Sequence, residues 1–336
     1  MLSLNLIMLI IVVVLAIAFD FINGFHDTAN AIATSVATRV LSIRAAIIMA
    51  ATLNFAGALM SEKVAKTISK GIVNDLKLSL AVVAAALLAA IIWNLITWYF
   101  GIPSSSSHAL IGGLIGASVA HSWSLEVVSW NTVLYKVILP LLASPIVGYL
   151  AGLFLMSFLY KALRKVSNSI VNRIFAKLQI VSAAFMAFSH GNNDAQKSMG
   201  IIALALLVSG QMGPNDSIPV WVKLSCALAM ALGTSIGGWK IIKTMGVNMI
   251  KLQPIGGFAA ETGAALVIET ATAFGMPVST THVISTAIMG VGSSKRLSAV
   301  RWSVARSIVW AWVLTIPLTM LLGGILTSIF AFFKLT

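Results

Sequence analysis

Long apolar runs follow one another along almost the whole chain and restrict the folds it can adopt. A scan with a window of ~19 residues marks about ten such runs, which fall into two sets of five. The first set covers residues 4–38, 44–62, 79–100, 104–121 and 131–160, and the second covers 178–209, 220–238, 254–275, 278–292 and 307–333. Because ~20 apolar residues are enough for a helix to cross a bilayer, the runs predict an all-α integral membrane protein.

The composition agrees with this prediction and excludes other classes of protein. The chain is 59% hydrophobic and only 9% charged, which is too apolar for a soluble protein. Its 22 Lys and Arg residues against nine acidic residues indicate basic cytoplasmic loops rather than a nucleic-acid partner. The single cysteine, Cys226, allows no intramolecular disulfide. The apolar N-terminus has no basic region before it, so we expect the first spanning helix there and not a signal peptide.

One short motif occurs twice, as GIPSSSSHALIGG at residues 101–113 and as GMPVSTTHVISTA at residues 275–287. Pro interrupts the apolar run in each copy, and the hydroxyl residues after it are typical caps of a new helix. The N–H groups at such a helix end attract an anion. The runs that follow, 104–121 and 278–292, are short, which predicts half-helices in re-entrant hairpins. Capping alone would also explain the hydroxyls, but duplication at matched positions favours an anion site.

Two further motifs recur in the same order and indicate an internal duplication. GFHDTANAI, residues 24–32, matches GNNDAQKSM, residues 191–199, and this match aligns Asp27 with Asp194. In the next pair of motifs, Lys63, Lys66 and Thr67 match Lys240, Lys243 and Thr244. We therefore divide the chain into a first transmembrane repeat at 1–160, a basic cytoplasmic linker at 161–177 and a second transmembrane repeat at 178–336.

Loop charge predicts that the two repeats are inverted. The linker holds five basic residues and no acidic one, so it is predicted to be cytoplasmic. Counting from it places 39–44 and 295–306 inside, and 122–130, 210–219 and both termini outside. Corresponding loops then lie on opposite sides, as in an inverted repeat. One loop disagrees with this pattern, because residues 62–77 fall outside although they include four lysines.

Asp27 and Asp194 lie in the middle of apolar runs, where a charged side chain costs ~2.5 to 3.5 kcal/mol. The Asn and Gly residues beside them predict interrupted helices near 23–30 and 190–194. Carboxylates, amide oxygens and unwound backbone carbonyls suit a small hard cation such as Na+. The predicted cation-binding residues are Asp27, Asn30, Asn193 and Asp194, with the two aspartates as Na+ ligands. The alternative is that each Asp caps a restarting half-helix.

Several other polar residues also interrupt the apolar runs. Lys197 is predicted to pair with Asp194, three residues before it. The histidines are expected to hydrogen-bond within loops, because none has a metal-ligand spacing on one helix face; they are His26, His108, His190 and His282. Glu261 and Glu269 share a helical face, so one or both are candidates to line a pathway.

The motifs GFHDTANAIAT, SHGNNDAQKSMG, GGFAAETGAA and GMPVSTTH resemble the signatures of the inorganic phosphate transporter (PiT) family over nearly the whole chain. The resemblance implies phosphate co-transport driven by sodium or by protons, in some members as a metal complex, at a site between the repeats. The chain lacks the long central hydrophilic loop of the animal members. Ser104 also departs from its counterpart, Val278. The predicted substrate-binding residues are Ser105, Ser106 and Ser107 in the first copy and Ser279, Thr280 and Thr281 in the second.

These features predict a symporter of inorganic phosphate in the cell membrane, with no catalytic residue and no resident cofactor. A co-transported cation drives it, with Na+ favoured over H+. A sulfate permease of the same family and a metal-phosphate/proton symporter are the alternatives. A lipid-directed enzyme is disfavoured because Ser and His are neighbours in sequence rather than converging from separate segments, and a passive anion channel conflicts with buried carboxylates. No nucleotide-binding loop is present. Whether the protein forms a homodimer is left open.

Overall fold

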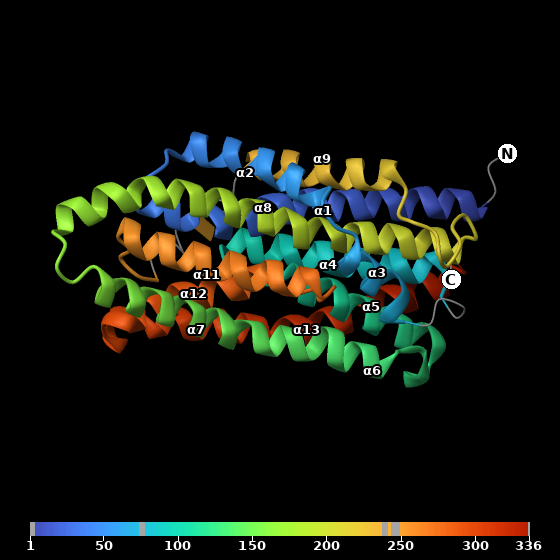
Figure 1. Cartoon of the computed structure of the whole chain (residues 1–336). Helices are drawn as coiled ribbons and strands as arrows, with labels where there is room; N and C mark the ends of the chain where they lie inside the picture. Colours follow the sequence, from blue (N-terminus) through green and yellow to red (C-terminus); the bar gives the residue numbers. More distant parts are fainter. Residues whose placement is uncertain (1–3, 74–77, 237–240, 243–248, 335–336) are drawn as a thin grey trace.

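The computed structural model describes residues 4–73, 78–236, 241–242 and 249–334, and Lys240, Lys243 and Thr244 of the repeated lysine motif lie outside them. The described chain forms helices that run along one long axis (Figure 1). The helices are α1 (Leu4–Ala37), α2 (Ile43–Ala58), α3 (Lys63–Gly71), α4 (Leu80–Phe100), α5 (Ser106–Ser122), α6 (Trp130–Thr132), α7 (Leu139–Ala162), α8 (Asn168–Val208), α9 (Val220–Ile236), α11 (Pro254–Ala273), α12 (Thr280–Lys295) and α13 (Trp302–Phe332). A π-helical segment, Val133–Ile138, joins α6 to α7, and single 3-10 turns follow α5 (Leu125–Val127) and α12 (Leu297–Ala299).

Each predicted apolar run overlaps a helix, and the all-α membrane class is confirmed. By length and composition, five spans in the described chain could cross a membrane: α1, α4, the α6–α7 helix, α8 and α13. The bent pair α2 and α3, at 67°, would be a sixth. The helices after the two Pro motifs are short, as predicted, with 17 residues in α5 and 16 in α12.

The predicted interruptions around Asp27 and Asp194 are wrong. Both residues lie inside continuous helices, α1 with 34 residues and α8 with 41. The glycines beside the aspartates serve close packing instead of unwinding. A Cβ atom on Gly24 would lie 2.4 Å from the Met230 carbonyl oxygen, and one on Gly191 would lie 2.2 Å from the Asn54 carbonyl oxygen. The glycines beside the aspartates therefore mark places where two helices pack closely, α1 against α9 and α8 against α2.

The basic linker is shorter than its predicted range of 161–177. Helix α7 ends at Ala162, and α8 begins at Asn168, so the second part of that range is helical. At 1.5 Å per residue, α8 is about 60 Å long, roughly twice the thickness of a hydrocarbon core. Its polar first turns therefore extend beyond the apolar layer.

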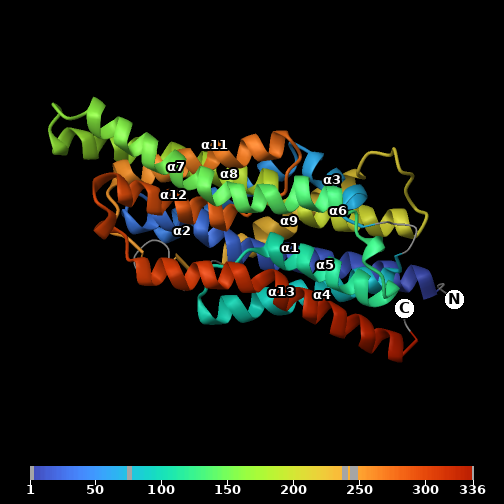
Figure 2. The same cartoon turned by 90° about the horizontal axis from the view of Figure 1, so that it is seen from below.

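The two halves of the chain run in opposite directions along the long axis. Figures 1 and 2 show α1 running away from the end that holds both termini, whereas α8 runs toward it. Likewise α7 runs away from that end, and α13 runs toward it. The loops after α5 and α8 lie at the end with the termini, and the loops after α1, α7 and α12 lie at the other end. This grouping of loops follows their predicted charge, while their sides of a membrane stay a prediction.

The two Pro motifs form equivalent breaks. Gly101 and Gly275 adopt the left-handed conformation, each with φ of 68°, and end the preceding helical segments. Helices α5 and α12 then begin near the middle of the bundle and run to opposite ends (Figures 1 and 2). Each of these helices packs against a helix of the other half of the chain: α5 packs against α13, and α12 packs against α7.

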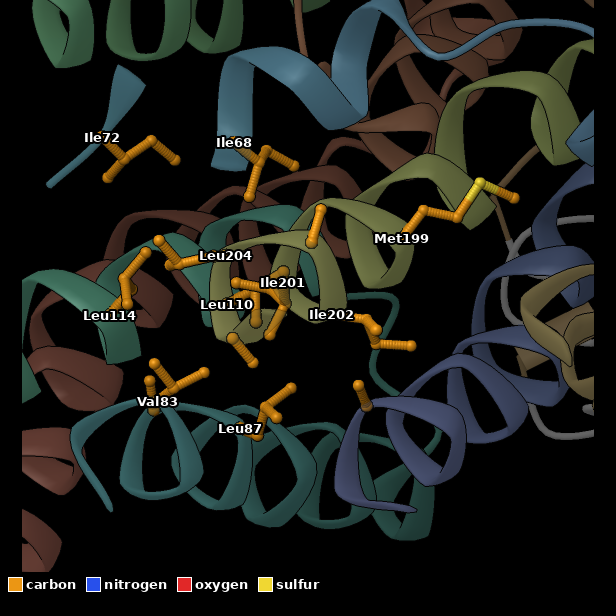
Figure 3. Close-up of a cluster of buried hydrophobic side chains, with 14 of the residues drawn as sticks. Ile68, Ile72, Val83, Leu87, Leu110, Leu114, Met199, Ile201, Ile202 and Leu204 are labelled. Atoms are coloured by element: carbon orange, nitrogen blue, oxygen red, sulfur yellow. The ribbon is translucent and has the colours of Figure 1, made fainter. Parts of the chain in front are cut away.

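A buried apolar cluster anchors α5 to the rest of the bundle. Figure 3 shows side chains of α3, α4, α5 and α8 meeting in it, among them Leu87, Leu110 and Ile201. Close by, residues 63–71 of the predicted lysine-rich loop form helix α3, and the carboxylate of Glu62 before it offsets part of the lysine charge. Glu62 pairs with Lys66 at 3.4 Å and with Lys223 of α9. This pairing offsets part of the positive charge of residues 62–77, which disagreed with their predicted position outside the cell.

Candidate functional site

The centre of the bundle is a polar cluster where the N-termini of α5 and α12 meet. Ser107 Oγ, on α5, donates to the Val278 carbonyl oxygen at 3.0 Å, directly before α12. The rings of His108 and His282, in the first turns of the two helices, lie 4.6 Å apart. The two Pro motifs, distant in sequence, therefore form one site.

Ser105 and Ser279 are the N-cap residues of these helices. Each side-chain oxygen accepts a hydrogen bond at 3.2 Å from a backbone N–H three residues later, that of His108 or His282. Both were predicted as substrate-binding residues. In this structure their side chains are used as caps, the alternative that the sequence left open.

Asp27 receives hydrogen bonds from both halves of the chain. Ser106 Oγ donates to Asp27 Oδ2 at 2.7 Å, and Thr281 Oγ1 donates to Asp27 Oδ1 at 3.0 Å. His26 Nδ1 lies 2.7 Å from the same Oδ1, and its Nε2 lies 3.0 Å from Thr97 Oγ1. This buried carboxylate thus joins α1 to the first turns of α5 and α12.

Asp194 has a related environment on α8. Thr280 Oγ1, the counterpart of Ser106, donates to Asp194 Oδ2 at 3.3 Å. Lys197 Nζ lies 2.8 Å from Asp194 Oδ1, which agrees with the pairing predicted from sequence. Asn23 Nδ2, on α1, also donates to Oδ2, at 3.4 Å. Each aspartate is therefore contacted by the matching hydroxyl of its own half, and Lys197 compensates part of their charge.

Asn193, one of the two predicted asparagine ligands, donates its hydrogen bonds to α11 and the segment after it rather than to an aspartate. Asn193 Nδ2 donates to Thr272 Oγ1 at 2.8 Å and to the Met276 carbonyl oxygen at 3.4 Å, which ties α8 to the end of α11. The side chain of Asn30 lies outside what the structure describes. Because α1 and α8 are continuous, their backbone carbonyls are also engaged in helix hydrogen bonds rather than free for a cation.

All four histidines lie in helices, so their predicted placement in loops is wrong, and they divide between hydrogen bonding and ring stacking. His26 contacts Asp27 as above, and His190 Nδ1 lies 3.0 Å from Asn54 Oδ1. His282 stacks on Trp312 at 3.9 Å between ring centroids. Within the described residues no three His, Cys, Asp or Glu side chains are placed to hold a metal ion.

Glu261 lies in a separate buried cluster on α11. Thr34 Oγ1 and Ser182 Oγ each donate to its carboxylate at 2.5 Å, and Gln179 Nε2 donates at 3.2 Å. Glu269, two helical turns later, is only half-buried and accepts from Asn192 Nδ2 at 3.1 Å. The two glutamates do not join the aspartates in one site.

Sequence reasoning missed three buried residues near the centre. Thr97 and Asn54 are polar residues of a kind that is common within apolar runs, and nothing in the sequence around them indicated a role in the site. Asp20 did have one, because it interrupts LAIAFDFIN just as Asp27 interrupts its own surroundings. All three side chains are at most 3% exposed.

A helical membrane protein in which two half-helix N-termini converge on buried carboxylates has the architecture of a secondary transporter. The comparisons with known proteins agree. The model of the phosphate transporter family matches residues 23–170 and 160–323. This chain belongs to that family, and it is therefore a transport protein and not an enzyme.

Curated relatives match along nearly the whole chain. A Bacillus subtilis (strain 168) protein named a probable low-affinity inorganic phosphate transporter is 49% identical over 322 residues, covering 95% of this chain and 96% of its own. A Mycobacterium tuberculosis (strain H37Rv) protein of the same name is 46% identical over 96% of this chain and 77% of its own. Among solved structures, one titled the sodium-dependent phosphate transporter superposes with a TM-score of 0.86 at 26% identity, covering 97% of this chain and 99% of the other.

Proposed function

We propose that this protein is a symporter that carries inorganic phosphate together with a cation, with Na+ as the favoured ion. The observation that carries the proposal is the meeting of α5 and α12 around Asp27, with hydroxyls of both halves directed at one carboxylate. Hydroxyl and N–H donors at two helix N-termini suit a tetrahedral oxyanion. Ser106, Ser107, Thr280 and Thr281 are the side chains proposed to hold it.

Charge in the site explains why the anion needs a companion. Asp27 and Asp194 contribute two negative charges and Lys197 one positive charge, so the resting cluster is negative. A phosphate ion would add further negative charge in a region of low dielectric constant, where repulsion is strong. Cations bound at the aspartates would remove this repulsion, and the two species would then bind and cross together.

Burial of the site requires a change of conformation for transport. The four hydroxyl residues are at most 2% exposed, so the anion has no open route to them in this conformation. We propose that the opposed halves act as inverted repeats and expose the site to each side in turn. Helices α5 and α12, which begin at the site and run to opposite ends, are the elements whose movement would open it.

Sodium is favoured over protons for two reasons. The oxygens around Asp27 and Asp194 are hard ligands of the kind that Na+ prefers, and the similar solved structure is titled a sodium-dependent phosphate transporter. Sulfate has a similar size and shape. It cannot donate a proton to an aspartate as phosphate can, so phosphate is the favoured anion.

Uptake of labelled phosphate into proteoliposomes tests the proposal. We expect an inward Na+ gradient at equal pH to drive accumulation, and a tenfold excess of sulfate to leave it largely unchanged. Asp194→Asn should abolish the Na+-driven part, while Asp216→Asn, a change in an exposed loop, should have no effect. Uptake driven only by a proton gradient would show that H+ and not Na+ is the coupling ion. Uptake abolished by a metal chelator would indicate that metal phosphate is carried. Competition by sulfate equal to that by phosphate would contradict phosphate as the preferred substrate.

A further inference from the structure

Asp20 is a buried acid that the site described above does not use. It lies on α1, about two turns before Asp27, and is 0% exposed. Apart from a loose contact with the Ser198 hydroxyl, its carboxylate oxygens have no hydrogen-bond partner within the described chain. Ionising a carboxyl group without an ion-pair partner inside a membrane-spanning bundle is costly, and such groups mark candidate functional sites.

Two nearby residues, Asn23 and Ser198, also have buried oxygens that make no regular hydrogen bond among the described residues. Asn23 is one helical turn away on the same face of α1. Its Oδ1 is buried and accepts no hydrogen bond in the part of the chain that is described. Ser198, on α8, makes a loose hydrogen-bond contact with Asp20, and its buried hydroxyl has no closer partner among the described residues. Asp20 thus contacts Ser198 of α8, and Asn23, one turn further along α1, contacts Asp194 of the same helix α8.

The charge around Asp20 is incomplete by one unit. Asp194 and Lys197 are its charged neighbours, but the lysine ammonium pairs with Asp194 at 2.8 Å, and no ion pair joins it to Asp20 among the described residues. With both carboxylates ionised, the two carboxylates and one ammonium carry a net charge of −1. One monovalent cation would make the group neutral.

The ligand chemistry favours a hard monovalent cation. All three side chains offer oxygen, which suits Na+ and not a soft transition metal. The sequence repeat provides no second copy, because Asp20, Asn23 and Ser198 align with Ala187, His190 and Ala31. The site would therefore be single, in contrast to the matched pair of Asp27 and Asp194.

We propose that Asp20, Asn23 and Ser198 form an additional cation site that binds Na+ beside the Asp194–Lys197 pair. This site rests on the proposed function, because its Na+ would be one of the ions that accompany phosphate. Asn23 links the two sites, because its Nδ2 donates to Asp194 Oδ2 at 3.4 Å while its Oδ1 is left for the cation. A bound ion would hold Asn23 in this orientation, and so stabilise Asp194 where the anion is to bind.

Binding of ²²Na+ to the purified full-length protein without phosphate tests the site directly. We expect Asp20→Asn to remove one Na+ per chain from the binding stoichiometry, or to weaken that site at least about tenfold. Ser198→Ala should weaken it less, whereas Ser198→Thr, which retains the hydroxyl, should bind like the parent. Asp216→Asn is the control for loss of a carboxylate elsewhere.

The outcomes separate this site from phosphate transport. Loss of one Na+ in Asp20→Asn supports the site even if the protein fails to accumulate phosphate, in which case the proposed function fails alone. Unchanged ²²Na+ binding in both Asp20→Asn and Ser198→Ala overturns the site, whether or not phosphate is transported. If Asp20→Asn does not fold, an unchanged affinity in Ser198→Ala is sufficient to overturn it.

Discussion

At the scale of single residues, the hydroxyls in the first turns of α5 and α12 determine what the site can hold. Ser106 and Thr280 donate to Asp27 and Asp194. These donors can turn to an incoming oxyanion only if cations take over the carboxylates. In the proposed function, anion and cation binding would thus be connected through the same hydroxyl groups.

Ser106→Ala and Thr280→Ala should each raise the phosphate concentration for half-maximal uptake. Loss of one hydrogen bond to a charged ligand is worth ~1.5 to 3 kcal/mol, or roughly tenfold to a hundredfold. The matched control is Ser118→Ala, because Ser118 is a buried serine of α5 far from the N-terminus, with no hydrogen-bond partner within the described residues. Equal effects of Ser106→Ala and Ser118→Ala on half-saturation would contradict a role in anion binding.

Ser104→Val should change uptake less than Ser106→Ala. The sequence suggests this because the second motif has Val278 at the matching position. The structure agrees in placing the Ser104 hydroxyl away from the aspartate, where it donates to Thr97 Oγ1 at 2.9 Å. Phosphate uptake kinetics of the two variants provide the measurement. A larger loss of uptake in Ser104→Val than in Ser106→Ala would indicate that the anion site lies one or two residues closer to the Pro.

At the scale of helices, glycines set how closely the carboxylate-bearing segments pack. Gly24 brings α1 against α9, and Gly191 brings α8 against α2. These contacts place Asp27 and Asp194 in the centre of the bundle instead of at a lipid-facing surface. The hydroxyl-rich ends of α5 and α12 then reach them.

Gly24→Ala should therefore destabilise the protein. The added Cβ would lie 2.4 Å from a backbone oxygen of α9, which cannot move independently of its helix. We expect an overpacking cost of ~1 to 3 kcal/mol, seen as a lower midpoint in thermal unfolding followed by fluorescence. Gly324→Ala in α13 is the control, because its Cβ would have nothing nearer than 3.6 Å. A Gly24→Ala protein as stable as the control would show that the two helices separate readily.

The helices themselves could be predicted from hydropathy, and so could the breaks at the two Pro motifs, because Pro and hydroxyl residues act locally. The continuity of α1 and α8 could not. Gly24 and Gly191 have the same local signature whether they loosen a helix or allow another backbone close, and only the position of the Met230 or Asn54 carbonyl distinguishes the two. The contact between Thr281 and Asp27 was likewise beyond prediction, since it joins opposite halves of the chain.

At the scale of the whole molecule, the opposed halves and the segregated loops define a two-sided protein. The basic loops after α1, α7 and α12 share one end of the bundle, and the termini share the other (Figure 1). Retention of Lys and Arg in the cytoplasm would place the end with the basic loops inside the cell.

Single cysteines should test this orientation in a Cys226→Ala background. Glu126→Cys, in the exposed turn after α5, should react with an impermeant thiol reagent added to intact cells. Ser298→Cys, in the exposed turn after α12, should react only after the membrane is opened. Labelling of both from the same side would exclude inverted repeats and, with them, the alternating exposure proposed above.

The central claim is that one buried site binds phosphate and its cation together, and the affinity of the purified protein for phosphate at increasing Na+ concentration tests it most directly. Coupled binding is reciprocal, so Na+ should tighten phosphate binding and phosphate should tighten Na+ binding by the same factor. We predict at least about a tenfold gain in phosphate affinity from low to saturating Na+, absent in Asp27→Asn and Asp194→Asn. A phosphate affinity that does not depend on Na+ in the parent protein, or a dependence that persists in both variants, would contradict the account.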